Sequence, residues 1–357
     1  MNRRELLFFG GAAAVASIGG CQWLNVFDQR DRLRITGLLG AVPSKVINQF
    51  EAKSPQKVEF KAENSPSKLW QELQNSPNMA KDIAPHLVSI GDAWLDQAIA
   101  QSLIQPISPE LLAKMPHWQN LSPFWQQGVT RNNQVWAVPY RWGATAIAYR
   151  QDKLKFAITQ WSDLWRPELQ KKLSLPDDAR EVIGLVLKKL GQSYQPETLA
   201  NIPNLKQELK SLNSQVLTYS SDNYLQSMLG DDTLAAVGWT NDMFRAKKQN
   251  PNLQVVIPQD GTALWSDLWV IPKAASSEIA IAWIDFCLAP DIAAQITALS
   301  DAVSTSDLTQ VPNSVKSDPI KFFAPDIFTK SELILPLSPS VLDQYQDLWT
   351  KMRSGSL

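Results

Sequence analysis

From residue 32 onward the chain alternates between strand-like and helix-like hydrophobic patterns. Short apolar or alternating runs indicate strands, and apolar residues three or four apart indicate helices. This alternation is typical of an α/β fold, in which helices cover the faces of a sheet. The predicted strands are residues 33–39, 57–61 and 86–90, and the predicted helices are residues 45–53 and 94–103 and a third that starts at Ser65 and Pro66.

The middle of the chain is richer in strand-like segments. Residues 135–149, V-W-A-V-P-Y-R-W-G-A-T-A-I-A-Y, indicate two strands joined by a bend at the proline and glycine. Similar runs follow at residues 233–240, 253–258 and 267–272. A chain that crosses more than once between two lobes would produce this pattern. We therefore expect lobe 1 to comprise residues 32–142 and 262–310, and lobe 2 to comprise residues 143–261 and 311–357.

Residues 174–191, S-L-P-D-D-A-R-E-V-I-G-L-V-L-K-K-L-G, carry a cluster of acids directly before a helical pattern. Asp178 is the predicted N-cap, and Glu181 stands where a capping box needs its reciprocal partner. Gly191 suits the C′ position that ends the helix. A helix start therefore explains both acids, but a capping carboxylate keeps free lone pairs that could also bind an ammonium group. Asp177 is the predicted solvated neighbour.

Composition narrows the function. A chain of 357 residues suggests two domains or one domain with two lobes, and a net charge of -1 does not support nucleic-acid binding. No dinucleotide-binding, P-loop, nucleophile-elbow or zinc-protease motif is present in the sequence, so we expect neither an enzyme nor a cofactor. The count of 14 Trp fits a packed core, an interface or a binding box equally well.

The N-terminus has the order of an export signal: two arginines, a short apolar run and small residues before Cys21. I-G-G-C resembles a lipobox, and N-R-R-E-L-L resembles a twin-arginine motif. We expect a signal peptide at residues 1–20, a lipidated Cys21 and a tether at residues 21–31, which together place the protein in the periplasm as a membrane-anchored lipoprotein. An ordinary cleaved signal, with Cys21 incidental, is the alternative.

The cysteines and histidines predict neither a disulfide nor a metal site. A lipidated Cys21 leaves Cys287 without a partner, so Cys287 is the predicted buried free thiol. His86 and His117 lack ligand spacing to cysteines or acids, and we expect no zinc site.

Aromatic and acidic side chains meet on the later strand-like runs. Trp239 ends one run, and Trp265 and Asp267 lie two apart, on one face of another. An aromatic face beside a carboxylate suits an organic ammonium ligand, because the ring attracts the cation and packs on methylenes while the acid neutralises the charge. A core Trp beside a surface Asp would explain the same pattern.

Several segments together resemble the spermidine/putrescine-binding proteins of ABC transporters, within the bilobal solute-binding superfamily. The matching segments are residues 138–149, 161–169, 175–183, 237–241, 264–272 and 286–294. The resemblance implies an α/β fold with two lobes, the type II Venus-flytrap arrangement, and a ligand cleft at the hinge. It also implies that Asp178, Glu181 and Asp267 hold ammonium groups while Trp239 and Trp265 stack along the methylene chain.

Three segments depart from that family. Residues 36–44 and 299–306 lack its usual aromatic residues, and G-D-A-W replaces its segment after the third strand. In that segment Asp92 and Trp94 could supply the missing charge and ring, or Asp92 could simply cap a helix. One wall of the binding box therefore differs from that of the family, and the sequence does not decide between spermidine and putrescine as the ligand.

The predicted function is capture of a polyamine, by a monomer, for delivery to an inner-membrane ABC permease. Two alternatives stay open at this level. A ferric-ion-binding relative would need clustered tyrosinates, and Tyr219 and Tyr224 are five residues apart. A lipoprotein that senses a ligand without transporting it would share the same cleft.

Overall fold

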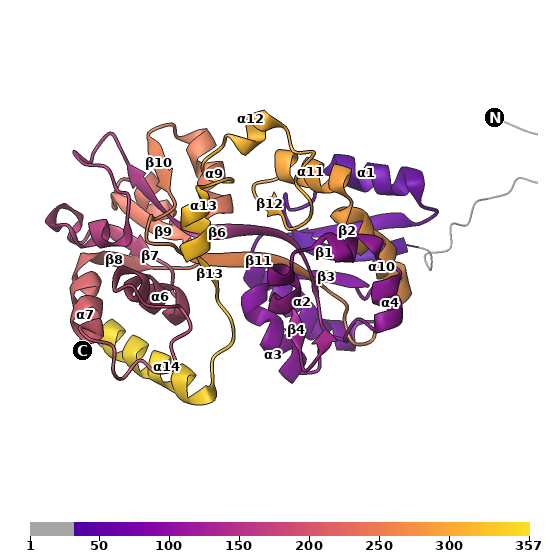
Figure 1. The fold of residues 1–357 in the computed structure, drawn as a ribbon, viewed down its shortest axis with the longest axis horizontal. Helices are drawn as coiled ribbons and strands as arrows, with labels where there is room; N and C mark the ends of the chain where they lie inside the picture. The colour runs from indigo at the N-terminus through magenta and orange to yellow at the C-terminus, as the bar shows by residue number, and fades with distance from the viewer. Residues whose placement is uncertain (1–31) are drawn as a thin grey trace, which may run out of the picture.

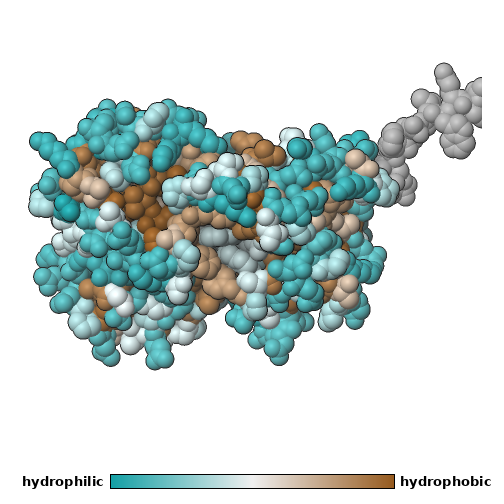
Figure 2. Space-filling model, turned by 45° about the horizontal axis from the view of Figure 1, so that its top comes forward, coloured by the Kyte–Doolittle hydropathy of each residue, from teal (hydrophilic) through white to brown (hydrophobic). Residues whose placement is uncertain are grey.

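The structure, a computed structural model, describes residues 32–357. The predicted signal peptide, Cys21 and the tether lie outside the described residues. The rest forms two lobes side by side, lobe 1 around β1–β3 and lobe 2 around β7–β9, with two long strands running between them (Figure 1). Figure 2 shows a hollow between the lobes.

The helices and strands follow the α/β pattern expected from the sequence. Those before the first crossing are β1 (Arg32–Leu38), α1 (Ser44–Lys53), β2 (Lys57–Glu63), α2 (Pro66–Asn75), β3 (Leu87–Gly91), α3 (Leu95–Ala100), α4 (Pro109–Ala113), α5 (Pro123–Gly128), β4 (Thr130–Arg131) and β5 (Gln134–Val135). β6 (Val138–Arg150) then crosses from lobe 1 to lobe 2. Lobe 2 contains β7 (Leu173–Leu175), α6 (Ala179–Lys189), α7 (Leu205–Gln215), β8 (Val216–Tyr219), α8 (Gln226–Leu229), β9 (Ala235–Trp239), α9 (Thr240–Gln249) and β10 (Leu253–Val256). The remaining elements are β11 (Ala263–Val270), α10 (Ser277–Leu288), α11 (Pro290–Leu299), β12 (Val303–Ser304), α12 (Asn313–Lys316), α13 (Pro325–Lys330), β13 (Glu332–Leu333) and α14 (Pro339–Ser354).

One sheet runs through both lobes in the order β2-β1-β3-β11-β6-β9-β7-β8. The first half of β6 pairs antiparallel with β11, and its second half pairs antiparallel with β9 and β10. The sequence predicted two strands in this stretch, which is wrong: β6 is one strand of 13 residues. Pro139 is accommodated beside a register shift in β11, between Asp267 and Leu268, and Gly143 gives room to a neighbouring ring.

Each lobe has its own apolar core. The lobe 1 core packs β1, β3 and β11 against α1, α2, α10 and α11, and Tyr140 stacks on Trp269 within it at 4.2 Å between ring centroids. The lobe 2 core packs β6, β7 and β9 against α6, α7 and α14. A third cluster covers the opposite face of β6 and β9 and includes Ile320 and Leu333, which follow α12 in the chain. The exact lobe boundaries stay a prediction.

Cys287 is fully buried in α10, as expected. The helix predicted over residues 94–103 is wrong in extent, since a 3₁₀ turn, η3 (Asp92–Trp94), precedes the shorter α3.

Within residues 32–357 no single helix is long and apolar enough to cross a membrane, although α10 and α11, bent by 74°, would suffice as a pair by length and composition.

Candidate ligand site at the hinge

The site is built on one face of the continuous sheet, where it passes from lobe 1 to lobe 2. Residues directly opposite in an antiparallel pair share a face, and so do residues two apart on a strand. The register pairs Arg141 with Asp267, Gly143 with Trp265 and Thr145 with Trp239. These three pairs therefore follow one another along the same face. Their side chains are the floor of the hinge.

The start of α6 reaches this floor from lobe 2. Asp178 is the N-cap, as predicted, and its Oδ1 accepts from the backbone N–H groups of Arg180 and Glu181 at 2.8 and 3.0 Å. The predicted reciprocal half of a capping box is not made, because the Glu181 carboxylate turns to Thr145 instead. Asp178 Oδ2 is left out of the cap. Asp177, just before it, is exposed, as predicted, and pairs with Arg353.

Glu181 is the most strongly perturbed acid on the floor. It is 5% exposed, and both of its carboxylate oxygens accept from Thr145 Oγ1, at 3.1 and 3.0 Å. Burial raises the pKa of Glu181, and the nearby carboxylates of Asp178 and Asp92 also raise it. Thr145 and the Trp239 side chain lower it, and the resulting pKa is about 8. Glu181 thus lies among acids from both lobes, and the charge of Arg180 also acts on it. A bound cation would restore its charged form.

Trp265 lies over the middle of the floor because Gly143 has no side chain. A Cβ on Gly143 would lie within 2.5 Å of Thr240 Oγ1 and closer still to the Trp265 ring. Trp265 is half-buried, and its indole Nε1 is buried without a hydrogen-bond partner. Trp239, at the end of β9, packs edge-on against Tyr224 at 5.6 Å between ring centroids. Two indoles therefore flank the acids, as the ammonium-box prediction requires.

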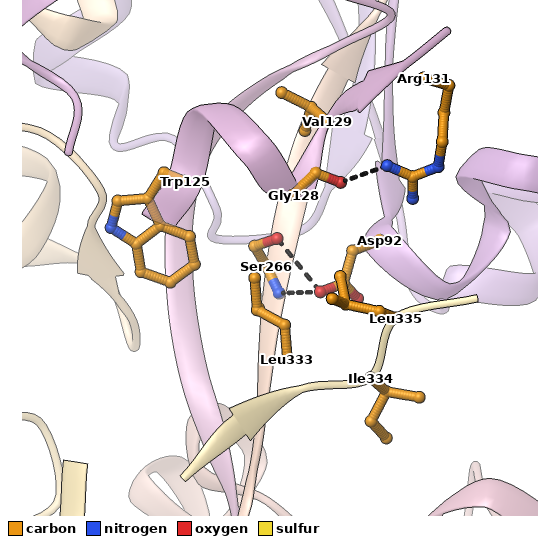
Figure 3. Close-up of a pocket in the computed structure, with 9 residues that line it drawn as sticks. All are labelled: Asp92, Trp125, Gly128, Val129, Arg131, Ser266, Leu333, Ile334 and Leu335. Carbon is orange, nitrogen blue, oxygen red and sulfur yellow. Dashed lines mark hydrogen bonds between the residues drawn. The ribbon is translucent and has the colours of Figure 1, made fainter. Parts of the chain in front are cut away.

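Lobe 1 contributes Asp92 to the site. Its Oδ2 accepts from both the backbone N–H and the Oγ of Ser266, at 3.0 and 3.2 Å (Figure 3). The alternative, in which Asp92 only caps a helix, is not what the structure shows, since Gly91 holds the N-cap position and Asp92 is the first residue of η3. Burial raises the pKa of Asp92 to about 7, with a smaller contribution from the charge of Asp267.

A small pocket opens beside Asp92. Its cavity volume is only about 10 Å³, room for about one water molecule, and it is open to solvent (Figure 3). Ser266, Asp92 and Arg131 supply its polar side, and its apolar side comes from Trp125, Val129 and the segment 333–335.

Trp94 packs within lobe 1. Its ring stacks on Trp70 of α2 at 4.7 Å and 24° between planes, and it packs against the lobe 1 core. It is half-buried, so one edge of it is free of the core. The role of Trp94 as a stacking group for a ligand stays a prediction.

Asp267 has a partner that the sequence reasoning did not consider. Arg141 Nε lies 2.5 Å from Asp267 Oδ2, and the two side chains are 3% and 16% exposed. Burial raises the pKa of Asp267 and the Arg141 charge lowers it, with burial the larger effect. Asp267 therefore already has a counter-ion in Arg141.

Sequence reasoning missed four residues of the site: Arg141, Thr145, Thr240 and Ser266. Arg141, Gly143 and Thr145 have the i, i+2, i+4 spacing of one strand face. That signal was available once the segment was taken as a single strand. Ser266 and Thr240 gave no signal of their own, because their contacts come from segments distant in sequence.

The arrangement suits a small organic cation better than a metal ion. Within residues 32–357 no group of three or more His, Cys, Asp or Glu residues is close enough to hold a metal. Tyr219 donates to Asn213 and Tyr224 to Asp242, and burial raises the pKa of both tyrosines well above the usual value. Such tyrosines do not favour the tyrosinate form that a ferric site needs.

Two lobes joined by shared strands, with an acidic and aromatic floor between them, define a solute-binding protein. The chain belongs to the bacterial extracellular solute-binding proteins, whose family model matches residues 82–330. These are binding proteins rather than enzymes, and they work outside the cytoplasm.

Individual proteins are similar to this chain in sequence and in structure. The spermidine/putrescine-binding periplasmic protein of Salmonella typhimurium is 32% identical over 71% of this chain and 72% of its own length. The putrescine-binding periplasmic protein PotF of Escherichia coli is 25% identical over 97% of this chain and 96% of its own. In structure, the spermidine/putrescine ABC transporter substrate-binding protein PotD of Streptococcus pneumoniae covers 92% of this chain and all of its own, with 21% identity and a TM-score of 0.79. The predicted family resemblance and the two-lobe α/β fold are both confirmed.

Proposed function

We propose that this protein captures a linear polyamine in the hinge cleft and delivers it to an ABC permease in the membrane. The observation that carries the proposal is the set of carboxylates on the cleft floor. Asp178 and Glu181 come from lobe 2, Asp92 comes from lobe 1, and the pKa values of Glu181 and Asp92 are raised toward and above neutrality. Acids that disfavour one another's ionisation are stabilised by a cation placed among them.

The aromatic residues support a ligand with methylene groups rather than a simple ion. Trp239 and Trp265 offer ring faces and edges beside the acids, where they can pack on carbon and attract an ammonium group. The relatives named above bind spermidine or putrescine according to their names. A cation that touches both lobes stabilises the closed state, because its affinity differs between open and closed forms.

Anchoring and export belong to the same proposal. Cys21 would carry the lipid and residues 1–20 the export signal, by the twin-arginine or the general route, so that a monomer is held near its permease. A structural relative from Treponema pallidum is described as a lipoprotein, with 20% identity and a TM-score of 0.71. Labelling with a radioactive fatty acid, lost in Cys21→Ser, tests the anchor.

Calorimetric titration of the purified protein with putrescine and with spermidine tests the binding proposal. We expect saturable binding of at least one of them. Asp178→Asn and Glu181→Gln should each weaken binding 10-fold or more, since charge-assisted hydrogen bonds contribute about 1.5–3 kcal/mol. Neither heat nor a thermal shift with either amine would refute the proposal. The exposed neighbour offers a matched control, because Asp177→Asn removes the same charge and should leave affinity unchanged.

A further inference from the structure

Arg141 places a buried positive charge on the floor of the cleft. It lies on β6 directly opposite Asp267 on β11, and its Nε is 2.5 Å from Asp267 Oδ2. The Arg141 side chain is only 3% exposed. A buried guanidinium at this position needs a counter-ion, and Asp267 supplies it.

This ion pair lies at the lobe 1 end of the floor. Thr145, which binds Glu181, is four residues away from Arg141 on the same strand face. Strand geometry separates the two by about 13 Å. Gly143 lies midway beneath the Trp265 ring, so the floor has an acidic end, an aromatic middle and an end where the charges are already paired.

We infer that Arg141 is a specificity-determining residue: it occupies the place on Asp267 that a distant ammonium group would take, and so limits the ligand to a short diamine. The inference rests on the proposed function and deepens it. An extended 1,4-diaminobutane places its two nitrogens about 6 Å apart, whereas the outer nitrogens of spermidine are about 11 Å apart. The shorter ligand can be held by Glu181 and Asp178 at the lobe 2 end without reaching Asp267. The longer ligand extends to the lobe 1 end of the floor, where Arg141 already neutralises Asp267.

Displacement of Arg141 by a ligand ammonium is unfavourable. It would break a buried ion pair and leave the guanidinium without a counter-ion. A third ammonium group placed beside the pair without displacing it would face Arg141 at close range, and like charges repel strongly where water is excluded.

A zwitterionic ligand does not fit the same charges. A carboxylate that approached Arg141 would also meet Asp267, whose charge acts on Asp92 as well. The pair as a whole is neutral, and its surroundings are acidic. Arg141 therefore serves as a resident cation and not as a carboxylate receptor.

Titration of the wild-type protein with putrescine, spermidine and 4-aminobutanoate is the direct test. We expect putrescine to bind at least about 10-fold more tightly than spermidine, and 4-aminobutanoate more weakly than either. Equal or tighter binding of spermidine would overturn the inference and leave the proposed function standing. The same holds if 4-aminobutanoate binds best of the three while putrescine still binds. Absence of binding by both amines would remove the proposed function and the inference together.

Variants separate charge from size. Arg141→Met frees Asp267 and should shift the ratio of affinities toward spermidine by 10-fold or more. Arg141→Met combined with Asp267→Asn removes both charges and should keep the wild-type preference. A shift toward spermidine in the double variant as well would mean that Arg141 acts only by its bulk, which overturns the inference.

The other end of the same strand provides a control. Arg150 is also a poorly exposed arginine on β6, and it pairs with Asp152 and Asp231 away from the cleft. Arg150→Met changes the net charge by the same amount and should leave the preference unchanged. If Arg141→Met does not fold, the double variant and the wild-type ratio still decide the question.

Discussion

Glu181 should make ligand affinity depend on pH near neutrality. Its carboxyl group has a pKa of about 8 without ligand, because it is buried beside Asp178 and Asp92. An ammonium ligand binds the ionised form, so below pH 8 part of the binding free energy is used to remove the proton. Lysine-like amines keep their charge through this range, with pKa values near ~10.4. The dependence therefore reports on the protein.

The magnitude follows from the pKa. Ionising a group with a pKa of about 8 costs roughly 2.7 kcal/mol at pH 6 and roughly 0.4 kcal/mol at pH 8. Affinity for putrescine should therefore rise about 50-fold between these pH values through Glu181 alone. Asp92, with a pKa of about 7, should add a factor of up to about 10.

Calorimetry at pH 6, 7 and 8 measures this slope, and repetition at pH 7 in buffers of different ionisation enthalpy measures the protons released. Glu181→Gln should bind more weakly at pH 8 and keep only the slope contributed by Asp92. Asp177→Asn, the exposed control, should keep the whole slope. If Glu181→Gln shows the same slope as the wild type, Glu181 is not the titrating group and the reasoning fails.

Three further predictions concern stability and packing. Between pH 5 and pH 8 Glu181 alone should cost the ligand-free protein on the order of 3 kcal/mol of stability, because a carboxyl whose pKa is raised from 4.5 to about 8 stabilises the folded state at low pH and loses this contribution as pH rises. Asp92 should add a smaller loss in the same window, and chemical denaturation should show that Glu181→Gln keeps only the Asp92 share. Asp178→Ala should cost about 1 kcal/mol through the lost cap, whereas Asp178→Asn should retain stability and lose affinity, and equal stability of the two variants would contradict the cap. Gly143→Ala should destabilise the protein by about 1–3 kcal/mol and weaken binding, because the added Cβ displaces the Trp265 ring; an unchanged melting temperature and affinity would show that the ring can move freely.

Local sequence signals predicted much of the fold and part of the site. Asp178 and Gly191 are positions where the backbone itself sets the residue type, through capping and a left-handed conformation, and both were predicted correctly. The early strands and helices followed their periodicity to within about two residues, except the helix predicted over residues 94–103, which ends at Ala100. The exposure of Asp177 also follows from its place before a cap.

The errors came from contacts between distant segments. Pro139 and Gly143 usually interrupt strands, but β11 and β9 supply pairing partners that keep β6 continuous. Glu181 was predicted to complete a capping box, but Thr145, 36 residues earlier, is a closer partner. The Arg141–Asp267 pair joins residues 126 positions apart, and no local spacing predicts it.

The place of β11 in the sheet has a consequence for how the chain is made. β11 lies between β3 and β6, yet the ribosome produces it only after the first segment of lobe 2, residues 143–261. At 5–20 residues per second, roughly 9–34 s separate the synthesis of β3 from that of β11. During that interval the edge of β3 is open and Tyr140 lacks Trp269, its stacking partner. Lobe 1 is thus an unfinished sheet with an exposed apolar edge, a state prone to pairing with other chains until the second crossing arrives.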